Sequence, residues 1–74
     1  MQLAELPVGD GGSIVSIEGS DQVARRLMEM GLTPGVLVTV VGEAPLGDPI
    51  ELEVRGYRLS VRRSEARRVE IDAG

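Results

Sequence analysis

The pattern of the chain changes at the stretch Leu27-Met28-Glu29-Met30-Gly31-Leu32-Thr33-Pro34-Gly35. Residues before it have helical spacing, and most residues after it alternate with a period of two. Gly31 is placed where a helix usually ends, because glycine adopts positive φ without a Cβ clash. Leu27 and Leu32 then form the apolar pair of a Schellman motif. Pro34 prevents the helix from continuing, and Gly35 allows a tight turn into a strand. A capped helix end is therefore favoured, with a functional surface as the alternative.

The helix that ends at Gly31 is predicted to begin after Gly19-Ser20-Asp21. Ser20 is the favoured N-cap, and Asp21 at the first helical position suits the positive end of the helix dipole. Apolar side chains follow at helical spacing, namely Val23, Ala24, Leu27, Met28 and Met30. A helix this short is marginal on its own, so we expect its apolar face to cover one open end of a sheet or barrel.

Strands are predicted on both sides of this helix. The lead-in Met1–Asp10 is expected to be extended and to place two or three of Leu3, Leu6 and Val8 on the core, and Gly9–Gly12 is expected to turn. The expected strands are 13–17, with Val15 and Ile17 on one face; 36–41, partly covered on both faces; 50–54; 57–61; and 67–71, with Val69 and Ile71 inward. Residues 64–66 are expected to form a single helical turn.

The clearest pattern is a hairpin over residues 50–61, in which Arg55-Gly56 forms a two-residue loop. Its predicted inward pairs are Val54 with Tyr57, Leu52 with Leu59, and Ile50 with Val61. On the outer face Glu53 is expected opposite Arg58. A slip of one residue would move the whole apolar set into water, so this register is strongly specified.

Five short strands in 74 residues leave two exposed edges unless the sheet curls and closes. We therefore predict a mainly β fold, a small SH3-like barrel of about five strands with one α-helix inserted after the first strand. A chain of this length is expected to form a single domain over residues 1–74.

The composition excludes several classes of function. The chain has no histidine and no cysteine, which removes the commonest general base, the thiol nucleophile and zinc–thiolate sites. Its net charge of −4 argues against a nucleic-acid partner. Tyr57 is the only aromatic residue, so no aromatic groove for a proline-rich peptide can form. No catalytic or nucleotide-binding motif is present, and neither is a membrane span or signal sequence, so we expect a soluble, cytoplasmic, non-enzymatic protein.

Two charged clusters have a functional and a structural interpretation. Asp48, Glu51 and Glu53 are weak candidates for oxygen ligands of a metal ion, although a solvated strand face is the favoured interpretation. The arginines near the C-terminus are either a patch for an acidic partner or surface charge balanced by nearby carboxylates; they are Arg62, Arg63, Arg67 and Arg68.

Two segments together resemble a known family. The first, 26–35, is similar to the R-L-x-x-[LM]-G-[LIM]-x-P-G signature of the ferrous iron transport protein A (FeoA) family. The second, Ala44-Pro45-Leu46-Gly47-Asp48-Pro49-Ile50, resembles the family's A-P-L-G-D-P-[IVL] loop. The hairpin, the segment 62–66 and the start of the chain also match, in the family's order.

This resemblance implies a cytoplasmic SH3-like barrel that acts in ferrous iron uptake as an accessory or regulator of FeoB, a GTPase-linked permease. The partner would be the cytosolic G domain of FeoB, so the protein would reach the inner membrane only through the transporter. The residues expected to contact the partner are Arg26, Met30, Leu32, Pro45, Leu46, Gly47, Asp48 and Pro49. Leu27, Gly31, Pro34 and Gly35 are the expected structural motif.

The family is also described as transition-metal binding. No cofactor is firmly implied here, and weak binding of Fe²⁺ or another divalent metal is left open. The alternative function is a metal sensor, because the chain also resembles the C-terminal SH3-like module of iron- and manganese-dependent repressors. Those repressors carry a winged helix that this chain cannot hold, so a stand-alone transport accessory is preferred. Apolar edge segments would also allow a homo-oligomer.

Overall fold

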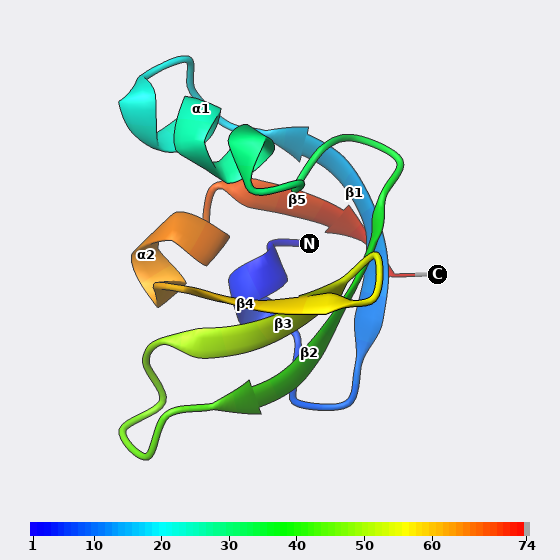
Figure 1. Ribbon diagram of the computed structural model, residues 1–74, viewed down its shortest axis with the longest axis vertical. Coiled ribbons are helices and arrows are strands. Elements are labelled where there is room, and N and C mark those ends of the chain that lie inside the picture. Colours follow the sequence, from blue (N-terminus) through cyan, green and yellow to red (C-terminus); the bar gives the residue numbers. More distant parts are fainter. Residues whose placement is uncertain (74) are drawn as a thin grey trace.

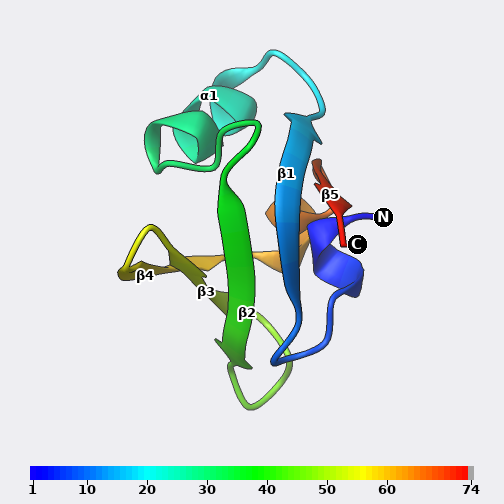
Figure 2. The same cartoon turned by 90° about the vertical axis from the view of Figure 1, so that its right-hand side faces the viewer.

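Five antiparallel strands form one curved sheet in the computed structural model, which describes residues 1–73 (Figure 1). The strands are β1 (Gly11–Ile17), β2 (Leu37–Glu43), β3 (Ile50–Val54), β4 (Tyr57–Val61) and β5 (Val69–Asp72), in the sheet order β4-β3-β2-β1-β5. The sheet curves so strongly that β3 and β4 pass behind β1 and β2 (Figure 2). The mainly β architecture with a helix after the first strand is as predicted.

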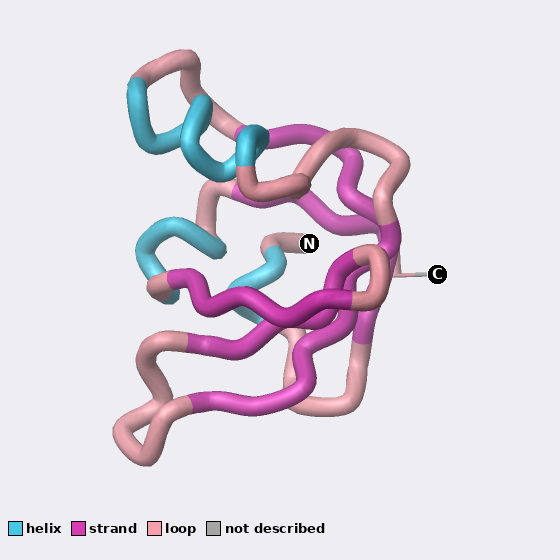
Figure 3. The backbone as a smooth tube through the Cα atoms, viewed as in Figure 1, coloured by secondary structure: helices cyan, strands magenta, loops and turns pink. Residues whose placement is uncertain are grey.

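Three helical segments complete the chain. They are the 3₁₀ turn η1 (Leu3–Glu5), the helix α1 (Gln22–Glu29) and the short helix α2 (Arg63–Ala66). The two α-helices are the cyan tubes at the left of Figure 3, and they lie on the same side of the curved sheet. The core inside the curve is aliphatic, and its largest fully buried side chains include Leu3, Ile14, Leu27, Leu32, Ile50 and Leu52.

The hairpin has the predicted register at every pair. Val54 lies opposite Tyr57, and Glu53 lies opposite Arg58. Both loop residues have positive φ, 50° at Arg55 and 86° at Gly56, as a two-residue type I′ turn requires. The period-two alternation therefore predicted the turn, the pairing and the buried face of β3. On β4 only Val61 is buried as predicted, whereas Leu59 is partly buried and Tyr57 is exposed.

The end of α1 is the predicted Schellman motif. Gly31 has a φ of 103°. Its N–H donates to the Met28 carbonyl at 3.0 Å, and the N–H of Leu32 donates to the Leu27 carbonyl at 3.1 Å. Leu27 and Leu32 are both fully buried. The Schellman motif thus packs the end of α1 on the core.

The start of α1 differs from the prediction. The N-cap is Asp21 and not Ser20, and the Asp21 side chain accepts from the Ala24 N–H at 3.1 Å. Asp21 is also held by Arg68 at 2.6 Å. Serine and aspartate are equally good N-caps by local preference, so the long-range ion pair with Arg68 is what favours Asp21 over Ser20.

The N-terminal part of the chain also departs from expectation. Leu3 and Leu6 are buried as predicted, but Val8 is 52% exposed, and the lead-in contains η1. The expected turn at Gly11-Gly12 already belongs to β1. In β1 the core residue is Ile14, so its neighbour Val15 faces outward and is 52% exposed, contrary to the prediction. Ile17 still packs on the core, because an irregularity between Ile14 and Ser16 shifts the register against β5.

The remaining strands are the central strand β2 and the edge strand β5. In β2, Val38 and Val40 are buried, and on the other face Thr39 and Val41 are partly buried, although Leu37 is 70% exposed. Both faces of the strand are therefore partly covered, as predicted. In β5, Val69 and Ile71 point into the core as predicted.

Candidate functional site

An open groove of about 770 Å³ lies between α1 and the segment that joins β4 to α2. Val23, Arg26 and Met30 line it from α1 and the C-cap of that helix. Val61, Arg62 and Glu65 line the opposite side. Val61 is buried and forms an apolar floor, while Val23 and Met30 are partly buried and pack on the core.

The helix end is fixed to the sheet beside this groove. The hydroxyl of Tyr57 donates to the Met30 carbonyl, which is one of the orphan acceptors at the end of α1. Tyr57 comes from the start of β4, and it is 44% exposed although its position faces inward. This contact ties Met30, and with it one wall of the groove, to the sheet.

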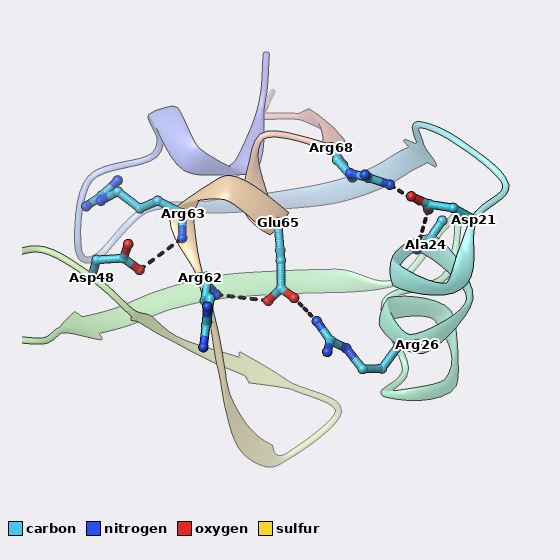
Figure 4. Close-up of polar contacts among 8 residues, drawn as sticks. All are labelled: Asp21, Ala24, Arg26, Asp48, Arg62, Arg63, Glu65 and Arg68. Carbon is cyan, nitrogen blue, oxygen red and sulfur yellow. Dashed lines mark hydrogen bonds and ion pairs between the residues drawn. The ribbon is translucent and has the colours of Figure 1, made fainter.

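An ion pair links the two sides of the groove. Arg26 of α1 pairs with Glu65 of α2, whose other carboxylate oxygen accepts from the backbone N–H of Arg62 at 3.1 Å (Figure 4). The Glu65 side chain is only 14% exposed, whereas that of Arg26 is 54% exposed. Glu65 is thus satisfied, and Arg26 still presents most of its surface to solvent.

A second ion pair lies at the start of α1 and involves Arg68, which also lines the groove. Arg68 donates to the carboxylate of Asp21 at 2.6 Å (Figure 4). This hydrogen bond, together with the one from the Ala24 N–H, holds the pKa of Asp21 below its usual value of 3.8. The same contact raises the pKa of Arg68. Both groups therefore stay charged at neutral pH.

The loop between β2 and β3 carries the most exposed large apolar side chain. Leu46 is 97% exposed. The loop is nevertheless closed on itself, because the Gly47 N–H donates to the Ala44 carbonyl at 2.7 Å and the Ala44 N–H donates to the Pro49 carbonyl at 3.0 Å. An apolar side chain held at the tip of a braced loop is suited to contact another molecule.

Arg63 anchors this loop to α2. Its Nε donates to the Gly47 carbonyl at 2.5 Å, and its terminal nitrogens reach the Ala4 carbonyl at 2.9 Å and the Glu43 carboxylate at 2.7 Å. Its backbone N–H donates to Asp48 Oδ1 at 3.1 Å (Figure 4). One side chain thus joins the loop, the end of β2 and the N-terminal segment.

The residues expected to bind a partner fall into three groups. Arg26, Met30 and Pro49 line the groove. Leu46 stands on the loop, and with it Pro45, Gly47 and Asp48. Leu32 is a correction: it is fully buried as the C″ residue that packs on Leu27, so its side chain is not available to a partner.

Sequence reasoning missed the residues that complete the groove. The sequence pattern predicts Val23 and Val61 on the core faces of their elements, and it predicts no role for Glu65 at the site. The available signal was the position of Glu65 three residues after Arg62, because a glutamate there caps the preceding backbone N–H. Its pairing with Arg26 could not be read from local spacing.

The four C-terminal arginines do not act as one patch. Arg63 and Arg68 are held by the contacts described above, whereas Arg62 and Arg67 are exposed. Of the four, only Arg62 and Arg68 line the groove.

The weak metal candidates are also separated in role. Glu51 and Glu53 lie on the exposed face of β3, and Asp48 accepts from Arg63. Within residues 1–73 there is no group of three or more side chains of the kinds that commonly hold a metal ion. That part of the chain also contains no helix long and apolar enough to span a membrane.

Known proteins share both the sequence and the fold. A curated relative from Porphyromonas gingivalis, an Fe(2+) transport protein A/Fe(2+) transporter FeoB fusion protein, is 40% identical over 72 residues. The match covers 97% of this chain but only 8% of the relative. The FeoA protein of Chlorobium tepidum is 41% identical with a TM-score of 0.90, over 99% of this chain and 70% of that one.

A zinc-complexed FeoA from Stenotrophomonas maltophilia, described as a prokaryotic SH3 domain protein, is 38% identical with a TM-score of 0.85. That match covers 99% of this chain and 91% of the other. The predicted SH3-like fold is thereby confirmed. A manganese-dependent transcriptional repressor, only 19% identical, shares the fold alone over 36% of its length, with a TM-score of 0.89.

The family model of the FeoA domain matches residues 1–73. Together with the relatives above 30% identity, this match confirms the resemblance found in the two sequence motifs. The chain belongs to the FeoA domain family.

Proposed function

We propose that this chain is a non-enzymatic accessory protein of ferrous iron uptake, which binds the cytosolic G domain of a FeoB-type transporter. The observation that carries the proposal is the Porphyromonas gingivalis relative, in which the matching segment and FeoB share one polypeptide. A covalent link raises the effective concentration of two modules that work together. Such a protein would be cytoplasmic and would reach the membrane through its partner.

The proposed contact surface combines the groove with the neighbouring loop. Met30 offers a partly buried apolar wall, and Leu46 offers an exposed apolar side chain. Apolar residues at the centre of an interface contribute most of the binding free energy, while the charged rim sets its orientation. The rim here is formed by Arg26 and Arg62.

The test is binding of the purified chain to the cytosolic domain of FeoB, measured by calorimetry. Leu46→Asp should weaken this binding by at least about tenfold, because it places a charge in the apolar centre of the contact. Leu37→Asp is the matched control: Leu37 is also strongly exposed, at 70%, but lies outside the groove and the loop. Equal affinity of the Leu46 variant and the native chain would rule out this placement.

A metal-sensing domain is the second candidate function. It is favoured by the zinc complex of the Stenotrophomonas maltophilia relative. Anaerobic calorimetry with Fe²⁺ or Mn²⁺ distinguishes the two functions, because a sensor must bind metal in its working range without FeoB present. Saturable binding coupled to a change in oligomeric state would favour the sensor.

A further inference from the structure

The groove is basic on a chain that is acidic as a whole. Three arginines and one glutamate line it, whereas the chain carries 8 basic and 12 acidic residues. Its single carboxylate, Glu65, is already engaged by Arg26 and by the Arg62 backbone. The groove therefore repels cationic groups more than the rest of the surface does, and it attracts anionic ones.

The guanidinium groups have hydrogen-bonding capacity left. Arg62 is exposed, and within residues 1–73 its side chain takes part in none of the ion pairs. Arg26 and Arg68 each pair through one terminal nitrogen, while a guanidinium carries five N–H donors. The Arg26 side chain is 54% exposed although that of its partner Glu65 is only 14% exposed, so an incoming carboxylate can reach the remaining donors of Arg26 while Glu65 stays in place.

The apolar lining of the groove favours an aliphatic group of the ligand, in addition to the carboxylates that the arginines favour. Val23, Met30, Pro49 and Val61 provide apolar surface between the charged walls. A ligand that satisfies both parts must place an aliphatic side chain on the floor and carboxylates beside the arginines. A nucleic acid would supply the negative charge but would bring many phosphates against a chain of net charge −4.

Building on the function proposed above, we propose that the groove binds a short acidic segment of the partner protein, with one or two aliphatic residues flanked by Asp or Glu. The aliphatic side chain packs on the floor at Val61 and against the wall at Met30, and the flanking carboxylates accept from Arg26 and Arg62. Charge complementarity fixes which segment docks, and the apolar floor holds it in place.

The experiment is a titration of the isotope-labelled chain with two peptides, followed by NMR. The probes are acetyl-Asp-Leu-Leu-Glu-amide and its neutral counterpart acetyl-Asn-Leu-Leu-Gln-amide. The acidic peptide should bind about tenfold more tightly at low salt, and this preference should disappear at about 0.5 M salt. The amide signals that move should be those of Val23, Met30 and Val61.

Variants separate the groove from general charge effects. Arg62→Glu should abolish the preference for the acidic peptide, and Arg62→Gln, which removes the charge without reversing it, should reduce it. Arg55→Glu is the control, because Arg55 is exposed at the β3–β4 turn and does not line this groove. Arg55→Glu changes the net charge by the same amount as Arg62→Glu, and it should leave the preference for the acidic peptide unchanged.

Several results would overturn the proposal. They are equal binding of the two peptides, signal changes confined to other surfaces, and no change with the acidic peptide up to about 5 mM. Self-association that Arg62→Glu disperses would instead assign the groove to a second copy of the chain. If the FeoB domain fails to bind while the acidic peptide binds, the proposed function fails and the groove specificity stands. If the FeoB domain binds but the two peptides bind equally well, the proposed function stands and the groove specificity fails.

Discussion

Gly31→Ala should destabilise the fold by about 2–4 kcal/mol, from two separable causes. The first is backbone strain, because Gly31 has a φ of 103° that a residue with a Cβ rarely adopts, at a cost of about 1–3 kcal/mol. The second is steric: the new Cβ would overlap the hydroxyl of Tyr57. Tyr57 is exposed enough to swing away, but it would lose its hydrogen bond to the Met30 carbonyl, worth about 1 kcal/mol.

Gly35→Ala isolates the first cause. Gly35 has a φ of 89°, and an added Cβ would meet nothing within 4 Å. Gly35→Ala should therefore lower the free energy of unfolding by about 1 kcal/mol less than Gly31→Ala does, when both are measured by urea unfolding. In a Tyr57→Phe background the two alanine substitutions should cost the same, because the ring carbon of residue 57 lies at an acceptable 3.5 Å from the new Cβ. Additive effects of Gly31→Ala and Tyr57→Phe would show that the hydroxyl contact does not act on this corner.

Three further outcomes are expected. Arg63→Met should lower the free energy of unfolding, measured with urea, by about 2–3 kcal/mol, because it leaves two backbone carbonyls and a carboxylate without their donor. Arg67→Met is the control at an exposed position and should change the free energy of unfolding by less than about 0.5 kcal/mol. The pKa of Asp21 is lowered in the fold. The ionised Asp21 therefore stabilises the fold fully above the unfolded pKa of 3.8, and this stabilisation is lost as pH falls through the lower folded-state pKa. Asp21→Asn should remove this part of the acid dependence of stability, while asparagine can still cap the helix. Leu32→Ala should cost about 2–5 kcal/mol in thermal or urea unfolding, whereas Leu46→Ala should leave stability unchanged and weaken FeoB binding.

The sequence predicted those features that local rules specify. The hairpin was predictable because every residue from Ile50 to Val61 agrees with one register, and a shift by one would expose the apolar face. The end of α1 was predictable because Gly31 and Pro34 act within a few residues of the helix. The capping pattern also implied that Leu32 is buried, so its assignment to a partner surface conflicted with the structural interpretation of the same stretch.

Features that depend on distant contacts could not be predicted. Asp21 replaces Ser20 as the N-cap through an ion pair with Arg68, which is 47 residues away in the chain. Ile14 and Ile17 both pack on the core although they are three residues apart, because the pairing of β1 with β5 is irregular between Ile14 and Ser16, and the residue types of this segment do not reveal that irregularity. The groove likewise depends on Arg26 meeting Glu65, a contact between two separate helices.

The short helix α2 joins the two parts of the proposed contact surface. Glu65 reaches α1 through Arg26, and Arg63 reaches the loop that carries Leu46. A helix of four residues cannot be stable by itself, so its position depends on these contacts and on the burial of Ala66. The groove wall and the loop are consequently positioned by one element. A partner that contacts both would therefore meet a surface that is already ordered, and binding would lose less conformational entropy than it would with two independent segments.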